Sequence, residues 1–415
     1  MTLPTWPCLT ADVPAVPGAI KRRYEDFRVE EIPAYRPSGE GEHVYVTIEK
    51  TGLATMRAVN DVARALGIAP RSIGVAGLKD ARGITRQMIS MQGIDPERIR
   101  GLRIPRIAIL AVDRHTNKLR IGHLRGNRFA IRLRETEPGR RRDVQAVLDV
   151  LVRRGVPNYF GPQRFGSRGD TGLIGRALLD GDYATAAALI AGRAGPHDTG
   201  EVLRARALYD RGEHEKAAAA WPYGFRECAH VCRTMARTGG DARRAIFGID
   251  RNVQGFYVSA FQSMLFNDLL ARRLDGIDRL MTGDLAYKEQ HGAIFRVEDA
   301  TVEQPRCDRF EISPTGPLFG PRMTAPSGEP AALEQAVLDA AERKLEDFPA
   351  TGPFRAIGGR RPLRFKPEGA EAEAGSDDAG PYLELRFSLP AGCYATSLLR
   401  EVCKERLEEG LRDDD

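Results

Sequence analysis

The chain has 415 residues, of which 29% are charged and 42% hydrophobic, a balance typical of a soluble globular protein of two or three domains. The proline-rich start, residues 1–20, has neither the basic beginning nor the apolar core of a signal peptide, and no apolar run reaches membrane-spanning length. Six scattered cysteines are too few for a disulfide framework, which indicates a reducing cytoplasm. The spacing of Cys228, His230 and Cys232 matches no strong zinc pattern.

Charge is distributed unevenly along the chain. Residues 1–167 hold 29 lysines and arginines against 17 acidic residues, so the net charge of +5 hides a first part at +12 and a remainder at −7. Between Arg98 and Arg142 there are fourteen basic residues and three acidic ones. Such a block is expected where a protein binds nucleic acid, although a solvated face explains the charge alone equally well.

In chain order, the pattern first predicts a strand around a turn over 20–32, with Phe27 among charges, and a half-buried strand over 43–48. Thr55 is expected to cap a helix that Gly67 closes. Apolar residues then predict two strands, 73–76 and 84–91, joined by a turn that begins at Gly77.

This turn presents Asp80 among the cationic residues Lys79 and Arg82. Positive neighbours favour the charged form of a carboxylate, so Asp80 is expected to be ionised at neutral pH. An ionised carboxylate suits a nucleophile or an electrostatic stabiliser better than a general acid. Taken alone, a carboxylate between basic residues in a turn is more commonly structural.

Three more strands are expected over 106–112, 118–121 and 128–133, followed by a helix over 142–154. In the last of these strands arginines alternate with apolar residues, which predicts one buried face and one basic face. A basic sheet face is a plausible platform for RNA.

The loop 155–166 is dense in glycine, proline, aromatic and amide side chains, and contains Asn158 and Phe160. Aromatic rings can stack on bases and amides can read a base edge. A structural turn is the alternative, but loops of this kind carry function more often than packing.

The second half of the chain predicts helices over 169–249, and then a helix that opens at Ser259 with a capping-box pattern. Short strands, loops and one helix follow up to residue 365. Residues 366–380 include Glu-Ala-Glu-Ala-Gly-Ser-Asp-Asp and predict an acidic low-complexity linker without a core. A strand over 382–389 and a last helix close the chain.

Several of these motifs resemble the TruD family, the tRNA pseudouridine(13) synthases, and they occur in the family's order. They are Gly77-Leu78-Lys79-Asp80, Val156-Pro157-Asn158-Tyr159-Phe160-Gly161, Gln163-Arg164-Phe165-Gly166, and Leu389-Pro390-Ala391-Gly392 with Ala395-Thr396-Ser397. Weaker matches extend the resemblance from about Lys21 to Val402. The helical stretch 169–249 is closer in length to archaeal and eukaryotic members.

The resemblance implies an α+β fold, in which a pseudouridine synthase catalytic domain with an antiparallel sheet is interrupted by an inserted α/β TRUD domain. The catalytic domain would comprise 1–167 and 381–415, and the inserted domain 168–380 with its acidic linker at 366–380. It also implies tRNA as the partner, with other RNAs as further candidates, and a reaction without cofactor or metal. The sequence leaves the oligomeric state open, with a monomer as the simplest expectation.

In the reaction that the family implies, an ionised aspartate acts on a flipped uridine, whose glycosidic bond is broken at N1 and remade at C5. Asp80 matches the family's essential aspartate, and Lys21 matches a basic residue expected beside it. Phe27, Asn158, Phe160 and Tyr394 match the substrate-binding positions or their loop. Attack at C1′, attack at C6 and a glycal route all stay open.

Two rival interpretations are a non-catalytic RNA-binding protein and a glycosidase or nuclease. The first predicts that Asp80→Ala behaves like the wild type. The second requires two cooperating carboxylates, and no second acidic residue stands in a comparable motif. Both rank below the synthase.

Overall fold

The computed structural model describes residues 5–410, and the chain folds into two compact units. Unit 1 comprises Met1–Pro7 and Asn158–Arg364, and unit 2 comprises Cys8–Pro157 and Phe365–Asp415. Residues 1–4 and 411–415, the two ends of the predicted catalytic domain, lie outside the described residues. Helices and strands are mixed throughout, so the α+β fold class is confirmed.

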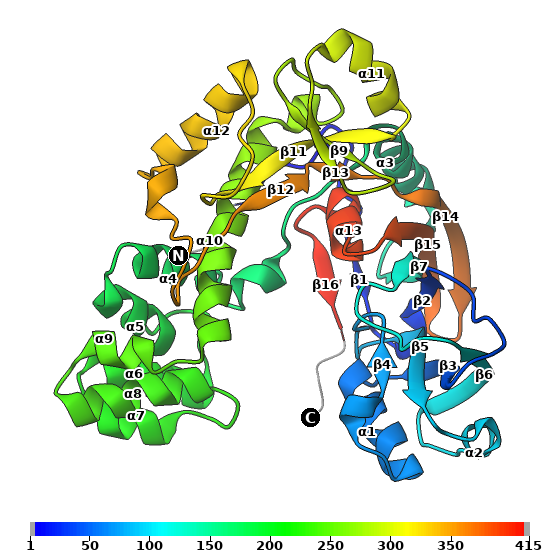
Figure 1. The fold of residues 1–415 in the computed structure, drawn as a ribbon, viewed down its shortest axis with the longest axis horizontal. Helices are drawn as coiled ribbons and strands as arrows, with labels where there is room; N and C mark the ends of the chain where they lie inside the picture. Colours follow the sequence, from blue (N-terminus) through cyan, green and yellow to red (C-terminus); the bar gives the residue numbers. More distant parts are fainter. Residues whose placement is uncertain (1–4, 411–415) are drawn as a thin grey trace. The chain divides into compact units, whose positions relative to one another are not determined.

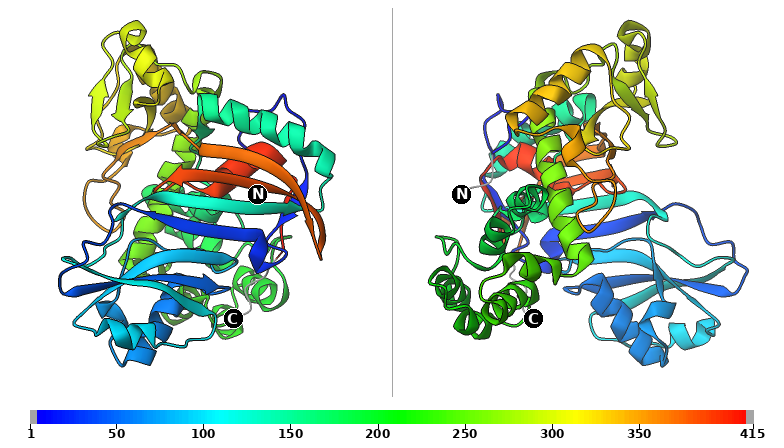
Figure 2. Two further views of the ribbon diagram at one scale, coloured as in Figure 1. Left: turned by 90° about the vertical axis from the view of Figure 1, so that its right-hand side faces the viewer. Right: turned by 60° about the vertical axis from the view of Figure 1, so that its left-hand side comes forward.

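Unit 2 is organised around one large sheet (Figures 1 and 2). All neighbours along the main path of this sheet are antiparallel except β2 and β5. At its side, β1 (Gly18–Ile20) pairs in parallel with β16 (Leu407–Glu409), which joins the two ends of the unit. In spatial order the strands of the main path are β14 (Glu368–Asp377), β15 (Gly380–Pro390), β7 (Leu124–Arg134), β2 (Phe27–Pro33), β5 (Ile84–Gln92), β3 (His43–Thr51) and β6 (Ile107–His115).

Three helices pack on one face of this sheet. Paired residues of neighbouring strands point to the same face, and the register therefore places Ile131, Val29, Ile89 and Val46 on one side. Helices α3 (Arg141–Arg154) and α13 (Ala395–Cys403) cover the β15–β7–β2 part of that side, and α1 (Thr55–Leu66) covers the β5–β3–β6 part. Two apolar cores thus share one face of the sheet.

The prediction of a coreless linker at 366–380 is wrong. Glu368–Asp377 forms strand β14, which pairs antiparallel with β15 over most of its length. The Glu-Ala repeat has the two-residue period of a strand, and Ala372, only 1% exposed, packs into the core that contains α3. The backbone of Ala372 also accepts a hydrogen bond of 2.7 Å from Arg141 Nε.

Two smaller predictions in unit 2 also fail. Residues 118–121 form no strand, and Leu119 is instead held by a 2.9 Å hydrogen bond from its backbone N–H to Ser90 Oγ. Helix α1 has the predicted span, but Ala54 occupies its N-cap, and the Thr55 hydroxyl is used elsewhere.

Unit 1 combines a bundle of short helices with a small sheet. The long helix α10 (Arg251–Arg272) packs on α4 (Thr171–Leu179) so closely that a Cβ at Gly175 would lie 2.1 Å from Tyr257 O. Helix α10 begins at Arg251, where Asp250 caps it, and the helix start predicted at Ser259 is therefore wrong. The other helices are α5 (Tyr183–Ala191), α6 (Gly200–Asp210), α7 (His214–Ala220), α8 (Arg226–Thr238), α9 (Ala242–Phe247), α11 (Ala300–Asp308) and α12 (Gly328–Ala340).

The small sheet of unit 1 has four strands in the order β10 (Ile294–Arg296), β9 (Leu285–Lys288), β11 (Ile312–Leu318) and β12 (Gly359–Pro362). The largest apolar core of unit 1 contains buried residues from helices α4 to α10 and from α12. Among residues 5–410, every helix falls short of the length and apolar character that crossing a membrane requires.

Candidate active site

Asp80 lies in unit 2 on the connection between β4 (Gly74–Val75) and β5, which pair antiparallel as the sequence predicts. Its carboxylate is held at both oxygens. The backbone N–H of Arg82 donates to Oδ1 at 2.8 Å, and Lys21 Nζ donates to Oδ2 at 2.7 Å. Asp80 therefore has a fixed orientation, and its side chain is 33% exposed.

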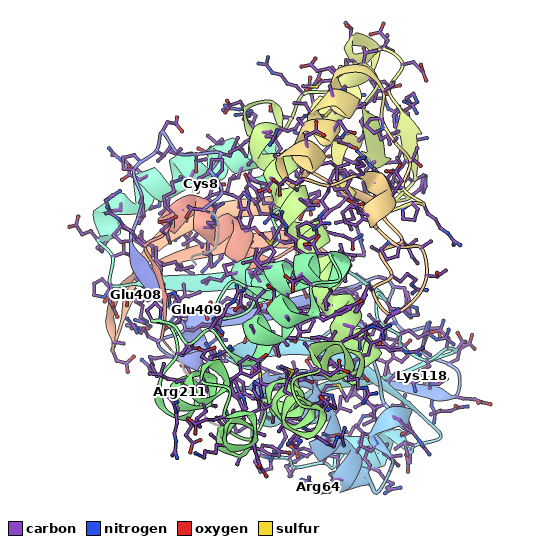
Figure 3. The ribbon with its side chains drawn as sticks, turned by 90° about the vertical axis from the view of Figure 1, so that its left-hand side faces the viewer. Cys8, Arg64, Lys118, Arg211, Glu408 and Glu409 are labelled. Carbon is purple, nitrogen blue, oxygen red and sulfur yellow. The ribbon has the colours of Figure 1, made fainter. Side chains whose placement is uncertain are left out.

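The electrostatics keep Asp80 ionised. Burial by itself would raise the pKa of this carboxyl group, but the hydrogen bonds from Lys21 and from the Arg82 backbone outweigh it, and the pKa lies below its ordinary value. Lys21 is buried, and its Nζ lies 4.5 Å from the centre of the Phe27 ring. A further carboxylate, Glu409 on β16 (Figure 3), approaches Lys21 Nζ at 3.8 Å.

Polar residues stand where the apolar face of the sheet would otherwise continue. Lys50 on β3 and Thr85 on β5 are register partners, and they point to the same side as Val46 and Ile89, yet both are fully buried. Lys50 Nζ donates to the backbone oxygens of Leu53 and Asp80, the latter at 2.9 Å. Burial lowers the pKa of Lys50 to about 8, although the charge of Asp80 opposes this.

The backbone before Asp80 is anchored by Thr55 at the start of α1. Thr55 Oγ1 accepts a 2.8 Å hydrogen bond from Lys79 N and donates one of 2.8 Å to Gln87 Oε1. Lys79 itself turns inward and forms a buried ion pair with Glu31 Oε2 at 2.8 Å. Glu31 Oε1 also accepts from Met88 N at 3.2 Å, so this pair ties the hairpin to β2 and β5.

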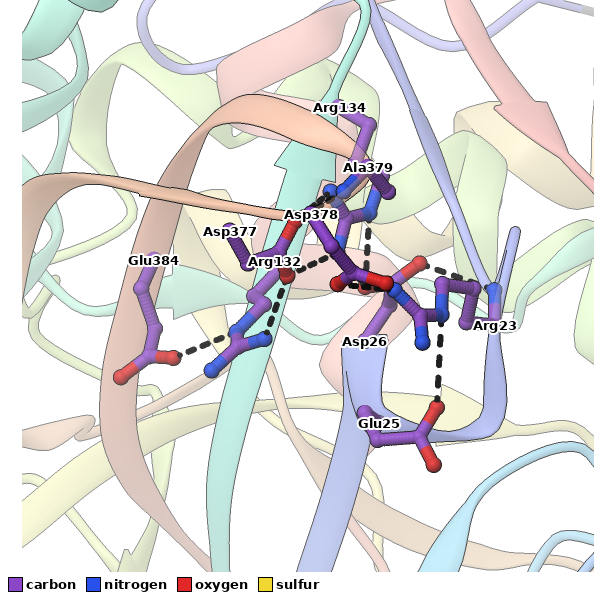
Figure 4. A network of polar contacts seen from close by, with 9 residues as sticks. All are labelled: Arg23, Glu25, Asp26, Arg132, Arg134, Asp377, Asp378, Ala379 and Glu384. Carbon is purple, nitrogen blue, oxygen red and sulfur yellow. Dashed lines mark hydrogen bonds and ion pairs between the residues drawn. The ribbon is translucent and has the colours of Figure 1, made fainter.

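The segment that carries Lys21 is fixed by a polar network (Figure 4). Lys21 has a φ of +58°, a left-handed conformation that is uncommon for a lysine. Beyond it, Asp26 accepts from Arg23 N at 2.9 Å and from Arg134 Nε at 2.7 Å. Arg134 also binds both carboxylate oxygens of Asp377, at 3.0 and 2.7 Å. The turn between β14 and β15 thus holds residues 23–26.

Of the predicted substrate-binding residues in unit 2, Phe27 is buried and Tyr394 is exposed. Phe27 is 6% exposed and meets Phe129 edge-on, with ring centres 6.4 Å apart. Its backbone oxygen would lie 2.2 Å from a Cβ at Gly83, so only glycine fits there. Tyr394 precedes α13 and is 53% exposed.

Asn158 and Phe160 belong to unit 1. The Asn158 amide is already engaged, because Nδ2 donates to Pro362 O at 2.9 Å and Oδ1 accepts from Arg361 Nη2. Phe160 is half-buried, with the Arg361 guanidinium 4.3 Å from its ring centre. Its backbone exchanges two hydrogen bonds with the side chain of Asn267, at 2.9 and 3.0 Å.

The prediction of a basic face on the sheet is wrong, because carboxylates pair with the arginines of β7. Arg128 pairs with Glu30, and Arg132 pairs with Asp377 and Glu384. Arg134 is 4% exposed and saturated by carboxylates. A strand of alternating arginines therefore forms a salt-bridged face and not an open cationic platform.

The structure brings the predicted residues Asp80 and Lys21 together, and it adds two buried charged residues that the sequence reasoning did not single out, Lys50 and Glu31. Lys50 had a signal, since it occupies an inward position in the alternation that begins with Val44 and Val46. Glu31 follows the same logic on β2, where it shares the side of Val29. A charged residue at an inward position of a strand is costly unless it is paired.

The fold and the site together define an α+β protein with a lysine-paired, ionised aspartate beside a sheet covered by helices. A family model described as tRNA pseudouridine synthase D (TruD) matches residues 6–402, so the chain belongs to that family.

Relatives of similar length support this assignment. The tRNA pseudouridine synthase D of Geobacter sulfurreducens is 49% identical over 396 residues, which cover 95% of this chain and 96% of that protein. The protein of the same description from Geobacter metallireducens is 46% identical over 397 residues, covering 95% and 97%. Full-length similarity is thus not limited to archaeal and eukaryotic members.

A crystal structure from Methanosarcina mazei, assigned as tRNA pseudouridine synthase D, has the same fold. It superposes with a TM-score of 0.85 at 26% identity and covers 97% of this chain and 99% of that chain.

Proposed function

We propose that this chain converts uridine to pseudouridine in tRNA, with position 13 as the expected target, and that Asp80 is the catalytic carboxylate. The observation that carries the proposal is the Asp80–Lys21 pair at 2.7 Å, in which the carboxylate is ionised and partly open to solvent. Membership of the TruD family and the names of its relatives supply the reaction class and the tRNA substrate.

The reaction needs few groups. The bond from C1′ to N1 of a flipped uridine breaks, a bond from C1′ to C5 forms, the C5 proton leaves and N1 gains a proton. No atoms are gained or lost, so the isomerisation has no redox step. Asp80 would act as a nucleophile at C1′ or C6, or as the base that removes the 2′ proton. Lys21 would keep Asp80 charged in every case.

The nucleoside-binding roles are refined by the environments of the four residues. Tyr394 is exposed and Phe160 is half-buried, and both are proposed to stack on bases, with a contribution of about 1–3 kcal/mol per base. Stacking of this size offsets much of the cost of base flipping. Phe27 and Asn158 are buried, so they are proposed to position neighbouring cations. The Phe27 ring would hold Lys21, and the Asn158 amide would hold Arg361.

Domain roles are part of the proposal. Unit 2 would be the catalytic domain and unit 1 the inserted TRUD domain, with boundaries at 157/158 and 364/365 in place of 167 and 381. Further RNA substrates, a monomeric state and a cytoplasmic location stay predictions. Primer-extension mapping of cellular RNA, gel filtration and cell fractionation test them.

The central experiment incubates a tRNA transcript with wild-type protein or with Asp80→Ala and maps pseudouridine by carbodiimide adducts and primer extension. A stop at position 13 with the wild type alone is expected. Stops elsewhere would keep the reaction and change the target. Equal RNA binding without any stop for either protein would favour a binding module, and release of free uracil would favour a hydrolase.

A further inference from the structure

Helix α8 in unit 1 carries a stripe of arginines. Arg233 follows Arg226 by seven residues and Arg237 follows it by eleven, which places all three on one side of the helix. All three are exposed. The opposite side, with Cys232 and Met235, is buried in the core of unit 1. Among residues 5–410, no carboxylate lies within ion-pair distance of Arg233 or Arg237.

Helix α9 extends this positive surface. Its end lies against α8, because a Cβ at Gly248 would be 2.4 Å from His230 Nε2. Arg243 on α9 is exposed, with its guanidinium 5.1 Å from the centre of the Phe247 ring. Burial and the charges of Arg233 and Arg237 lower the pKa of His230, which fits a positive potential over both helices.

Exposed aromatic rings accompany these arginines. Tyr223, just before α8, is 93% exposed, and Arg226 Nη2 donates to its hydroxyl at 3.3 Å. Phe247 on α9 is 44% exposed. Rings that stack on unpaired bases, beside guanidinium groups that bind phosphates, are the usual components of surfaces for single-stranded or looped RNA.

We propose that this α8–α9 face, formed by Tyr223, Arg226, Arg233, Arg237, Arg243 and Phe247, binds a looped segment of the RNA substrate. The proposal rests on the proposed function and gives the helical stretch 169–249 a role. On β7 in unit 2, Arg128 and Arg132 are paired with carboxylates. On the α8–α9 face, by contrast, no carboxylate within residues 5–410 pairs with Arg233, Arg237 or Arg243, so these three cations are available to phosphates.

The test compares the double variant Arg233→Glu/Arg237→Glu with a matched control, Arg211→Glu/Lys216→Glu, for binding to a tRNA transcript. The control makes the same charge change on the same helical stretch, but its residues (Arg211 is labelled in Figure 3) already pair with Glu213. Because the α8 variant removes two cations that would each bind a phosphate, it is expected to flatten the plot of log K against log salt by roughly 1.4–1.8.

For the same variant the KM for tRNA is expected to rise while kcat at saturation stays unchanged, and Tyr223→Ala should weaken binding about fivefold or more. Equal binding and equal KM for the α8 variant and the control would overturn the proposal. If the α8 variant flattens the salt dependence of tRNA binding as expected but the wild type forms no pseudouridine, the proposed reaction fails and the RNA-binding face stands.

A second observation concerns the polar network of unit 2 (Figure 4). Arg134 is buried between Asp26 and Asp377, and Asp377 also accepts from Arg132 at 3.0 Å and from the N–H of Ala379 at 3.0 Å. Asp377 thus braces the arginine that fixes Asp26. We infer that Asp377 is a positioning residue, which keeps Lys21 in its left-handed conformation against Asp80.

Hydrogen exchange of the amides 21–27 tests this inference without relying on catalysis. Asp377→Asn should speed their exchange and Asp377→Glu should restore protection. The control is Asp378→Asn, because Asp378 makes only a surface pair with Arg23, with a side chain 78% exposed. In active protein, Asp377→Asn should also move the acid limb of the pH–rate profile upward. A lower Tm with unchanged exchange at 21–27 and an unmoved acid limb would reduce Asp377 to a purely structural residue.

Discussion

Replacing Lys21 by methionine removes the cation nearest to Asp80 and keeps a side chain of similar length. An opposite charge at hydrogen-bond distance lowers the pKa of a carboxyl group by roughly one to three units, and each unit corresponds to about 1.4 kcal/mol. The Asp80 side chain is 33% exposed, so solvent screening makes the effect of removing Lys21 smaller than it would be for a fully buried pair.

The structure gives the direction in which the pKa of Asp80 should change. Lys21 holds the pKa of Asp80 down, so its removal raises that pKa and protonates Asp80 at a higher pH. The acid limb of the single-turnover rate should therefore move to higher pH. The rate on the neutral plateau should fall less than the rate in acid.

The assay is pseudouridine formation in single turnovers from about pH 3 to about pH 8, which brackets the ordinary aspartate pKa of about 3.9. Arg22→Met is the control, because this neighbouring cation pairs with Glu135 and Glu408 and not with Asp80. A folded Lys21→Met protein with an unmoved acid limb would refute the electrostatic role of Lys21.

Three further predictions concern stability. Glu31→Gln leaves its buried lysine partner unpaired and should cost about 3–5 kcal/mol in urea unfolding; a loss under about 1 kcal/mol would contradict the buried pair. Gly83→Ala should lower both Tm and activity, since its Cβ would meet the Phe27 carbonyl, and an unchanged protein would argue against that contact. Ala372→Asp should destabilise unit 2 strongly and Ala374→Asp hardly at all, and equal tolerance would restore the linker interpretation of 366–380.

Local patterns predicted most of the strands and helices of unit 2. The strands on either side of Asp80 are where the apolar residues and Gly77 placed them. The pairing of Asp80 with Lys21 follows from the family resemblance, because the neighbouring Lys79 turns away to Glu31. What sequence could not supply were partners distant along the chain. The arginines of β7 look like an open cationic row until Asp377 and Glu384, more than two hundred residues later, are placed beside them.

The same limit applies to Asn158 and to strand β14. An amide in a loop suggests recognition of a base, but Pro362 and Arg361 already use the Asn158 side chain. Acidic low-complexity composition suggests a linker, but pairing with β15 and a single buried alanine make the segment a strand. Most residues of such a strand face solvent, so they determine its acidic composition. The few residues that pack against the core hardly affect that composition.

The order of segments in unit 2 has a consequence for synthesis on the ribosome. Residues 8–157 emerge first, and the whole continuous stretch of unit 1 is translated before β14, β15 and α13, which at about 5–20 residues per second takes roughly 10–40 s. Through this interval β7 lacks its neighbour β15, and its apolar face is covered by α3 but not yet by α13. Strand β7 thus waits with an open edge until β15 is made, and Lys21 gains its neighbour Glu409, at 3.8 Å from Nζ, only after β15 has been made.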